Sequence, residues 1–354
     1  MNQKIDYLIN GLGLAGSTLA WELITRGKKV IVYDNPAGNK ASAVAAGLFN
    51  PVTGKYLVKT WQADVIFPFF EQFYISAEKQ LHQNFFHLLP IFSPFSSIDE
   101  RNFWKSKIET AELMAYARAF HETPCFTDQV NNPLGGIEIG HSGYLNVQLW
   151  TKAIRDFLIQ HNSYVESVLD ESEITFDEGV NYGGFQANKI IFCNGIAASE
   201  SRWFKNLPLI PLKGEVLQVK MNTRMERIYN RGVYIVPGPA ENIYTVGSTY
   251  DRPPFETGIT SDARESLESK LMELTPCGFE IVHQNWGIRP TTIDRRPVLG
   301  AHPDNKNVIL FNGLGTKGVS LAPYLAHHLA DWLEGQGELL REVNICRFKA
   351  LYSG

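Results

Sequence analysis

The chain has 354 residues, of which 44% are hydrophobic and 20% are charged, and its formal net charge is −4 at pH 7. This length and balance indicate a globular protein with two domains or one large α/β body carrying an insertion, and they exclude a disordered or low-complexity chain. The net charge gives no electrostatic reason to expect a nucleic-acid partner. We find no apolar stretch long enough to span a bilayer, and we expect a cytoplasmic protein without a signal peptide.

The cysteines and histidines show no pattern of a metal site or a disulfide framework. The four cysteines, Cys125, Cys193, Cys277 and Cys346, form no CxxC pair. The nine histidines lack the spacing of metal ligands. We therefore expect reduced thiols and no bound metal.

The first 34 residues carry the pattern on which the rest of the interpretation depends. In order they hold an apolar run (5–9), three glycines (Gly11, Gly13 and Gly16), a helical stretch (15–26), a second apolar run (30–33) and Asp34. This order predicts a strand–helix–strand unit that binds a dinucleotide. A purely structural unit of the same type is the alternative.

Each glycine has a physical role if the ligand is a dinucleotide. Gly11 makes the tight turn after the first strand, Gly13 lets a pyrophosphate approach the backbone, and Gly16 lets the helix lie against the sheet. The N–H groups at the helix start, at Leu14 and Ala15, then face the phosphate, and the helix dipole favours its negative charge.

Two further features are predicted to contact this cofactor. Asp34 stands where a carboxylate accepts hydrogen bonds from the ribose hydroxyls. The segment 41–47 is rich in alanine and glycine, which suits close approach of its backbone to a flat ligand, although a flexible linker is the alternative. From this segment we select four cofactor contacts: Ala41, Ser42, Ala46 and Gly47.

The rest of the chain alternates between helical and strand-like patterns. The spacing of apolar residues predicts helices over 61–81, 98–120, 147–160, 262–274 and 319–333. Short apolar or alternating runs predict strands over 85–95, 166–169, 189–193, 216–220, 232–236, 243–248, 279–289 and 308–311, and a small hairpin made of 174–176 and 183–187.

This order predicts an α/β protein with a doubly wound, Rossmann-type cofactor domain and a second, β-rich substrate domain. We assign residues 1–84, 139–210 and 287–354 to the cofactor domain. Residues 85–138 and 211–286 form the substrate domain, so both domains are discontinuous in sequence.

Several motifs in the same order resemble one family. They are GLGLAG (11–16), IFCNG (191–195), PLKGEV (211–216), VYIVPG (233–238), YTVGST (244–249), GIRPTTIDRRPVLGAHP (287–303) and NGLGTKGVSLAP (312–323). Together they resemble the D-amino-acid oxidase superfamily of FAD-dependent oxidoreductases, and most closely its glycine oxidase and sarcosine oxidase branch. The resemblance covers nearly the whole chain, which makes it more specific than any single motif.

The resemblance implies a glycine oxidase-like two-domain fold and an enzyme that oxidises the C–N bond of a small amine or amino acid by hydride transfer to flavin N5. In sarcosine oxidase relatives a cysteine near the position of Arg289 tethers the flavin. No cysteine stands near Arg289 here, so we expect noncovalent FAD. Val168 matches the residue beside the adenine, and Asn194 and Gly195 end a core strand at a ligand-facing turn.

The resemblance also implies residues that bind the substrate. Arg289 matches the carboxylate-binding arginine of the family, and a guanidinium can donate two parallel hydrogen bonds to a carboxylate. Tyr234 matches a tyrosine that shares this carboxylate in glycine oxidase. The alternatives are a surface arginine and a half-buried strand aromatic.

A second glycine-rich loop precedes the last predicted helix. Its cofactor contacts are expected at Gly313, Gly315, Thr316, Lys317 and Gly318. The N–H groups and dipole of this helix start could support negative charge at the N1–C2 edge of the flavin. Lys317 would add a full positive charge there, unless it is a solvated lysine.

One departure from the family pattern leaves alternatives open. Glycine oxidase carries a second arginine where this chain has Thr316. The Thr316–Lys317 pair is similar to the flavin domain of the bifunctional tRNA wobble-uridine enzyme, which oxidises a carboxymethylaminomethyl group. An NAD-dependent dehydrogenase, indicated by Asp34, and a flavin-binding module without turnover are further alternatives. The motifs do not distinguish oxygen from another electron acceptor.

Overall fold

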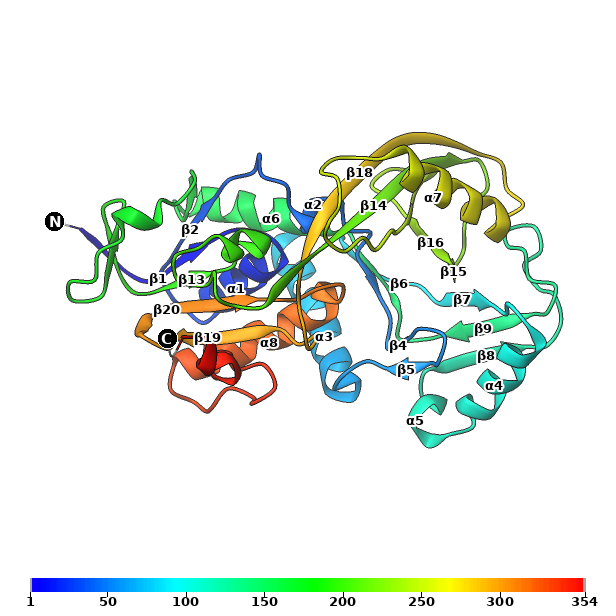
Figure 1. The fold of residues 1–354 in the computed structure, drawn as a ribbon, viewed down its shortest axis with the longest axis horizontal. Coiled ribbons are helices and arrows are strands. Elements are labelled where there is room, and N and C mark those ends of the chain that lie inside the picture. The colour runs from blue at the N-terminus through cyan, green and yellow to red at the C-terminus, as the bar shows by residue number, and fades with distance from the viewer. Residues whose placement is uncertain (1, 353–354) are drawn as a thin grey trace. The chain divides into compact units, whose positions relative to one another are not determined.

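The computed structural model describes residues 2–352 and divides into two compact units (Figure 1). Unit 1 consists of Met1–Ala43, Gln148–Leu212 and Gly287–Gly354, and unit 2 of Val44–Val147 and Lys213–Trp286. Both units are discontinuous in sequence. Residues 44–84 and 139–147, which the sequence analysis assigned to the cofactor domain, cluster with unit 2 instead. The assignment of cofactor and substrate to one unit each stays a prediction.

Unit 1 is built on a mainly parallel sheet. Its strands lie in the order β11 (Tyr164–Glu166), β2 (Val30–Asp34), β1 (Gln3–Asn10), β13 (Phe185–Phe192), β20 (Asn305–Asn312) and β19 (Val298–His302). The first five strands are parallel, β19 is antiparallel to β20, and β12 (Val180–Tyr182) pairs with β13. The central strands are apolar and buried, as in a sheet covered on both faces.

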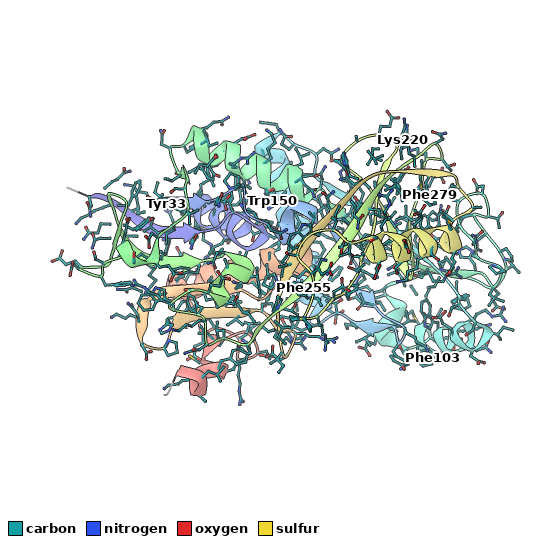
Figure 2. The ribbon with its side chains drawn as sticks, turned by 45° about the horizontal axis from the view of Figure 1, so that its top comes forward. Tyr33, Phe103, Trp150, Lys220, Phe255 and Phe279 are labelled. Atoms are coloured by element: carbon teal, nitrogen blue, oxygen red, sulfur yellow. The ribbon has the colours of Figure 1, made fainter. Side chains whose placement is uncertain are left out.

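Three helices of unit 1 pack together: α1 (Leu14–Thr25), α6 (Val147–Gln160) and α8 (Gly318–Leu333). Trp150 of α6, labelled in Figure 2, donates from Nε1 to Ser17 Oγ of α1 at 2.8 Å. The rings of Trp21 and Phe157 meet edge to face at 5.3 Å between the same two helices. Helix α1 also packs against α8.

A second core cluster in unit 1 joins the sheet to short segments. Side chains of β1 and β13, such as Leu8 and Ile190, contact Tyr182 of β12, Phe204 and Ile345. The short helical segments around this cluster are η1 (Glu171–Glu173), η2 (Gly195–Ser199) and η3 (Ile345–Tyr352). The sheet is therefore covered without a further long helix on this side.

Unit 2 is built on an eight-stranded sheet. The strands lie in the order β18 (Phe279–Thr292), β14 (Leu209–Met221), β17 (Ile243–Gly247), β16 (Val233–Pro237), β15 (Ile228–Arg231), β7 (Ile91–Pro94), β9 (Gly136–Ile139) and β8 (Ala117–His121). Helix α7 (Ser261–Leu274) packs on β15, β16 and β17 through buried leucines. Its start is capped by Thr260, whose side chain accepts from Ala263 N.

Smaller elements complete unit 2. They are α3 (Ala63–Leu81), α4 (Ile98–Ile108), α5 (Ala111–Met114), the sheet of β3 (Leu48–Phe49), β10 (Gly143–Leu145) and β6 (Phe86–Leu88), and the pair β4 (Val52–Thr53) and β5 (Val58–Lys59). The short helix α2 (Ala41–Val44) lies where unit 1 ends and unit 2 begins in the sequence. In the described residues no helix is long and apolar enough to cross a membrane.

Several predicted elements are confirmed, and four are wrong in extent or type. The helix predicted over 98–120 ends at Ile108, and its last part is strand β8, because pairing with β9 overrides the local pattern. The strand predicted over 85–95 is broken into β6 and β7 around Pro90. The hairpin is made by β12 and β13 rather than by 174–176. Strand β11 ends at Glu166, so Val168 lies beyond it and is 67% exposed.

A buried ion pair joins elements of unit 2. Lys213 Nζ lies 2.9 Å from Glu215 Oε1, and both side chains are at most 2% exposed. Glu215 also accepts from the N and Oγ1 of Thr260 and from Gln284 Nε2. Burial raises the pKa of Glu215, but these bonds outweigh burial and leave its pKa below the usual value.

We predict that Lys213→Met lowers the free energy of unfolding by about 3 kcal/mol, because it leaves a buried carboxylate without its cation. Lys220→Met is the matched control, since Lys220 is exposed on the same strand (Figure 2). Urea denaturation followed by circular dichroism measures both variants. Equal stability of the two variants would contradict a structural role for the pair.

Candidate cofactor site

The predicted glycine loop connects β1 to α1 in unit 1. Gly11 has a φ of +102°, and a Cβ at this position would lie 2.8 Å from the carbonyl oxygen of Cys193. A Cβ on Gly16 would lie only 1.8 Å from the carbonyl oxygen of Gly11. A larger residue at Gly11 would therefore push the turn away from the end of β13, and one at Gly16 would push α1 away from the turn.

The N-cap residue of α1 provides no side-chain cap. This residue is Gly13, which has no side chain to accept from the first helical N–H groups. Ser42 lies beside this position, because Leu14 N donates to Ser42 Oγ at 3.0 Å and a Cβ on Gly13 would lie 3.1 Å from the same oxygen. Gly13, Leu14 and Ser42, all predicted contacts, are thus together, and Ala15 follows them in the first turn of α1.

Asp34 lies at the carboxyl end of β2 and is only 5% exposed. Its Oδ1 accepts from Leu12 N in the glycine loop at 2.8 Å. Lys40 Nζ lies 2.7 Å from Oδ1 and 2.6 Å from Oδ2. The carboxylate is therefore buried with a cation and tied to the glycine loop, which is where a ribose-binding acid is expected.

The end of β13 brings a buried acceptor to the same region. Asn194 follows this strand, and Gly195 has a φ of +59°. Asn194 Oδ1 is buried without a hydrogen-bond partner, and a Cβ on Gly11 would lie 3.0 Å from Asn194 Cα. A buried acceptor without a donor is costly, so it fits a site that receives a donor from a ligand.

The second glycine loop connects β20 to α8 and reaches the first helix. Gly313 and Gly315 have φ values of +74° and +55°, which favour glycine. A Cβ on Gly318, the first residue of α8, would lie 3.0 Å from Leu14 Cδ1. The starts of α1 and α8, far apart in sequence, are therefore adjacent within unit 1.

Lys317 is the N-cap residue of α8, and its side chain is half-buried. Burial lowers its pKa from 10.5 to about 8. A half-buried cation next to the positive end of a helix favours an anion nearby. The neighbouring Thr316 is exposed.

The remaining predicted residues are divided between the units. Strand β18 crosses the boundary between the units, and Arg289 is half-buried on its last part (287–292), which belongs to unit 1, whereas Tyr234 is half-buried on β16 in unit 2. Ala46 and Gly47 also belong to unit 2, where a Cβ on Gly47 would lie 1.8 Å from Leu145 O. Ala41 begins α2 in unit 1. Their contacts with a cofactor or substrate stay predictions.

Sequence reasoning missed residues that the fold brings to this site. Asn312 donates from Nδ2 to Gly195 O at 2.8 Å and so joins the ends of β20 and β13. Lys40 and Tyr164 stand near Asp34. No local pattern marks these three residues, because each is brought close by strand pairing or by a loop.

The residues present fit a dinucleotide cofactor. The first glycine loop leaves no room for a Cβ at Gly11 and Gly16, the starts of α1 and α8 are adjacent, and Asn194 offers a buried acceptor without a partner. The described part of the chain contains no group of three or more His, Cys, Asp or Glu side chains that could hold a metal ion.

Comparison with known proteins gives the family. The model of the family described as FAD dependent oxidoreductase matches residues 6–332. The bifunctional protein ThiO/ThiG of Trichormus variabilis is 25% identical over 97% of this chain and 55% of its own length. The tRNA 5-methylaminomethyl-2-thiouridine biosynthesis bifunctional protein MnmC of Hahella chejuensis is 23% identical over 93% of this chain and 57% of its own length.

Among solved structures, glycine oxidase from Bacillus cereus is similar with a TM-score of 0.75 and 19% identity, over 94% of this chain and 96% of that one. This confirms the predicted glycine oxidase-like two-domain fold. The chain spans somewhat more than half the length of the two bifunctional relatives. The family match confirms FAD as the cofactor and favours it over NAD. The chain belongs to the FAD-dependent oxidoreductase family that contains the D-amino-acid oxidases, and it is an enzyme of that family.

Proposed function

We propose that this enzyme oxidises the C–N bond of a small amine or amino acid that carries a carboxylate. The observation that carries the proposal lies in unit 1. Gly315 N, in the second glycine loop, donates to Pro290 O at 3.0 Å. Arg289 immediately precedes Pro290. The residue proposed to bind the carboxylate is thus tied through one turn to the loop proposed to hold the flavin ring.

Different groups of the proposed contact residues bind different parts of FAD. The first glycine loop and the start of α1 hold the diphosphate, Asp34 holds the ribose, and residues 313–318 hold the flavin ring. FAD, when bound, would supply a two-electron acceptor for the hydride of the carbon beside the neutral amine nitrogen, the resulting iminium ion would release a proton to give the imine, and oxygen or another acceptor would reoxidise the reduced flavin.

The protein itself binds and orients the substrate. A guanidinium donates two parallel hydrogen bonds to a carboxylate, which fixes both the position and the orientation of the neighbouring carbon. Arg289 is proposed for this role, with Tyr234 as the second contact. Lys317 at the start of α8 would stabilise negative charge at the ring edge, and the N–H groups of the loop would assist it.

A second candidate substrate is a carboxymethylamino group on a modified tRNA nucleoside. Thr316 stands where the glycine oxidase pattern has a second arginine, and MnmC proteins are among the relatives. A group of this kind also places a secondary amine next to a carboxylate, so Arg289 would serve it equally. The net charge of −4 does not favour a large polyanionic partner.

A substrate panel tests the proposal. The purified protein should be yellow, release FAD on denaturation and lose its flavin colour anaerobically with one member of the panel. The panel holds glycine, N-methylglycine, iminodiacetate, proline, uncharged amines and tRNA that carries the carboxymethylaminomethyl group. Bleaching by uncharged amines alone would overturn the carboxylate part of the proposal, and bleaching by the tRNA alone would favour the second candidate.

We predict that Arg289→Ala raises KM for the carboxylate substrate by about 30- to 1,000-fold, because a bidentate charged contact is worth about 2–4 kcal/mol. FAD should stay bound. Arg289→Lys should recover part of the loss, since one charged donor remains. Arg341→Ala, which removes an exposed arginine of unit 1, is the control. An unchanged KM in Arg289→Ala would remove this residue from the site.

We also predict a pH dependence that originates at Lys317. Sulfite binding makes the flavin negative, and it can be followed by absorbance without turnover. Lys317→Met should weaken sulfite binding by about tenfold at pH 7, where the lysine is mainly protonated. Because the pKa of Lys317 is about 8, the difference from the wild type should shrink as the pH rises above this value.

The exposed Lys306 provides the matched control for this titration, so Lys306→Met should bind sulfite as the wild type does. If the ratio of sulfite affinities between the wild type and Lys317→Met stays constant from pH 6 to 10, the charge of Lys317 does not stabilise the flavin–sulfite adduct.

A further inference from the structure

The surroundings of Asp34 limit what its carboxylate can bind. Oδ1 accepts from Leu12 N and lies 2.7 Å from Lys40 Nζ, and Oδ2 lies 2.6 Å from the same ammonium group. The two oxygens of a carboxylate offer about four acceptor positions. Both positions on Oδ1 and one on Oδ2 are therefore in use, so Asp34 can accept from one further donor.

A ribose presents two neighbouring hydroxyls. A carboxylate that binds such a diol alone needs one free position for each hydroxyl, and Asp34 has only one. Lys40 can supply the partner for the second hydroxyl. Its ammonium group has three N–H donors, of which two are directed at Asp34, so the third can donate to a hydroxyl oxygen. The pair thus offers one acceptor and one donor side by side.

From this geometry we propose that Lys40 and Asp34 bind the ribose diol of the adenosine half of FAD as a unit. One hydroxyl donates to Asp34 Oδ2, and the other accepts from Lys40 Nζ. The inference rests on the proposed role of Asp34 in ribose binding and assigns Lys40 as a residue that determines the affinity and specificity of the adenosine end.

A third side chain supports a polar binding site at this position. Tyr164 of β11 lies beside β2, where its partner across the strands is Val32. Its hydroxyl is buried and makes no hydrogen bond of normal geometry, although it lies near enough to Asp34 for a side-chain hydrogen bond to that carboxylate to contribute to its pKa. Burial and then the nearby charge of Asp34 raise its pKa to about 12, so it stays a neutral donor. A buried phenol of this kind is costly unless a further polar group meets it.

The local chain explains why Lys40 reaches Asp34 from six residues away. Asn35 begins a turn in which its Oδ1 accepts from Ala37 N and its carbonyl oxygen accepts from Gly38 N. The turn returns the chain to the site, where Lys40 meets Asp34 and Ser42 meets Leu14 N. One short segment therefore contacts both the ribose end and the diphosphate end of the proposed site.

The test measures the release of FAD from the purified, full-length holoprotein, followed by the recovery of free-flavin fluorescence on dilution. Asp34→Asn and Lys40→Met should each weaken FAD binding by about tenfold or more, since each loses a hydrogen bond to a charged group. Lys40→Arg should keep most of the affinity because it retains a donor. Lys29→Met, which removes an exposed charge of unit 1, should release FAD as the wild type does.

Competition by ADP, 2′-deoxy-ADP and 3′-deoxy-ADP separates recognition from a structural effect. The wild type should prefer ADP over both deoxy analogues. Lys40→Met should lose its preference over one of them and keep its preference over the other. A uniform loss of affinity for all three ligands would mean that Lys40 only supports the fold, and it would overturn the inference.

The variants of Asp34 and Lys40 distinguish the role of one residue from that of the other. If Asp34→Asn binds FAD and discriminates among the analogues as the wild type does, the proposed role of Asp34 is wrong. If Asp34→Asn is weakened while Lys40→Met binds FAD normally or more tightly, only the inference about Lys40 is overturned.

Discussion

The site depends on the close approach of α1 to the turn that follows β1. A Cβ on Gly16 would lie 1.8 Å from Gly11 O, so only glycine allows this contact. The same approach places Leu14 against Gly318, at the start of α8. Two helix starts, which each carry a partial positive charge, are thus held together within one unit. An extended ligand with a negative diphosphate and an electron-accepting ring matches such an arrangement.

The proposed cofactor site has charged groups at two places, the end of β2 and the start of α8. At one end the buried carboxylate of Asp34 is neutralised by Lys40, which leaves a polar and nearly uncharged surface suited to hydroxyl groups. At the other end Lys317 is the N-cap residue of α8, and burial lowers the pKa of its ammonium group. The proposed site therefore has a neutralised carboxylate at the end of β2 and a lysine at the start of α8.

A buried ion pair in unit 2 joins secondary-structure elements. Lys213 and Glu215 lie on β14, and the carboxylate also accepts from the N-cap residue of α7 and from Gln284 on β18. A single carboxylate thus joins two neighbouring strands and a helix. Because the carboxylate of Glu215 accepts hydrogen bonds from Thr260 and Gln284 as well as pairing with Lys213, it favours one arrangement of these elements even though a buried ion pair by itself contributes little net stability.

The sequence alone predicted the glycine loops and the acid after the second strand, because these depend on local spacing, and the resemblance of several motifs in the same order indicated the family and the discontinuous domains. Tertiary structure decided the rest. Residues 117–121 became a strand through pairing with β9, residues 44–84 joined unit 2, and Lys40 and Tyr164 met Asp34. The strand, the unit membership and the neighbours of Asp34 all depend on sheet pairing and loop closure. These bring together residues that are not marked by any periodic pattern in the sequence.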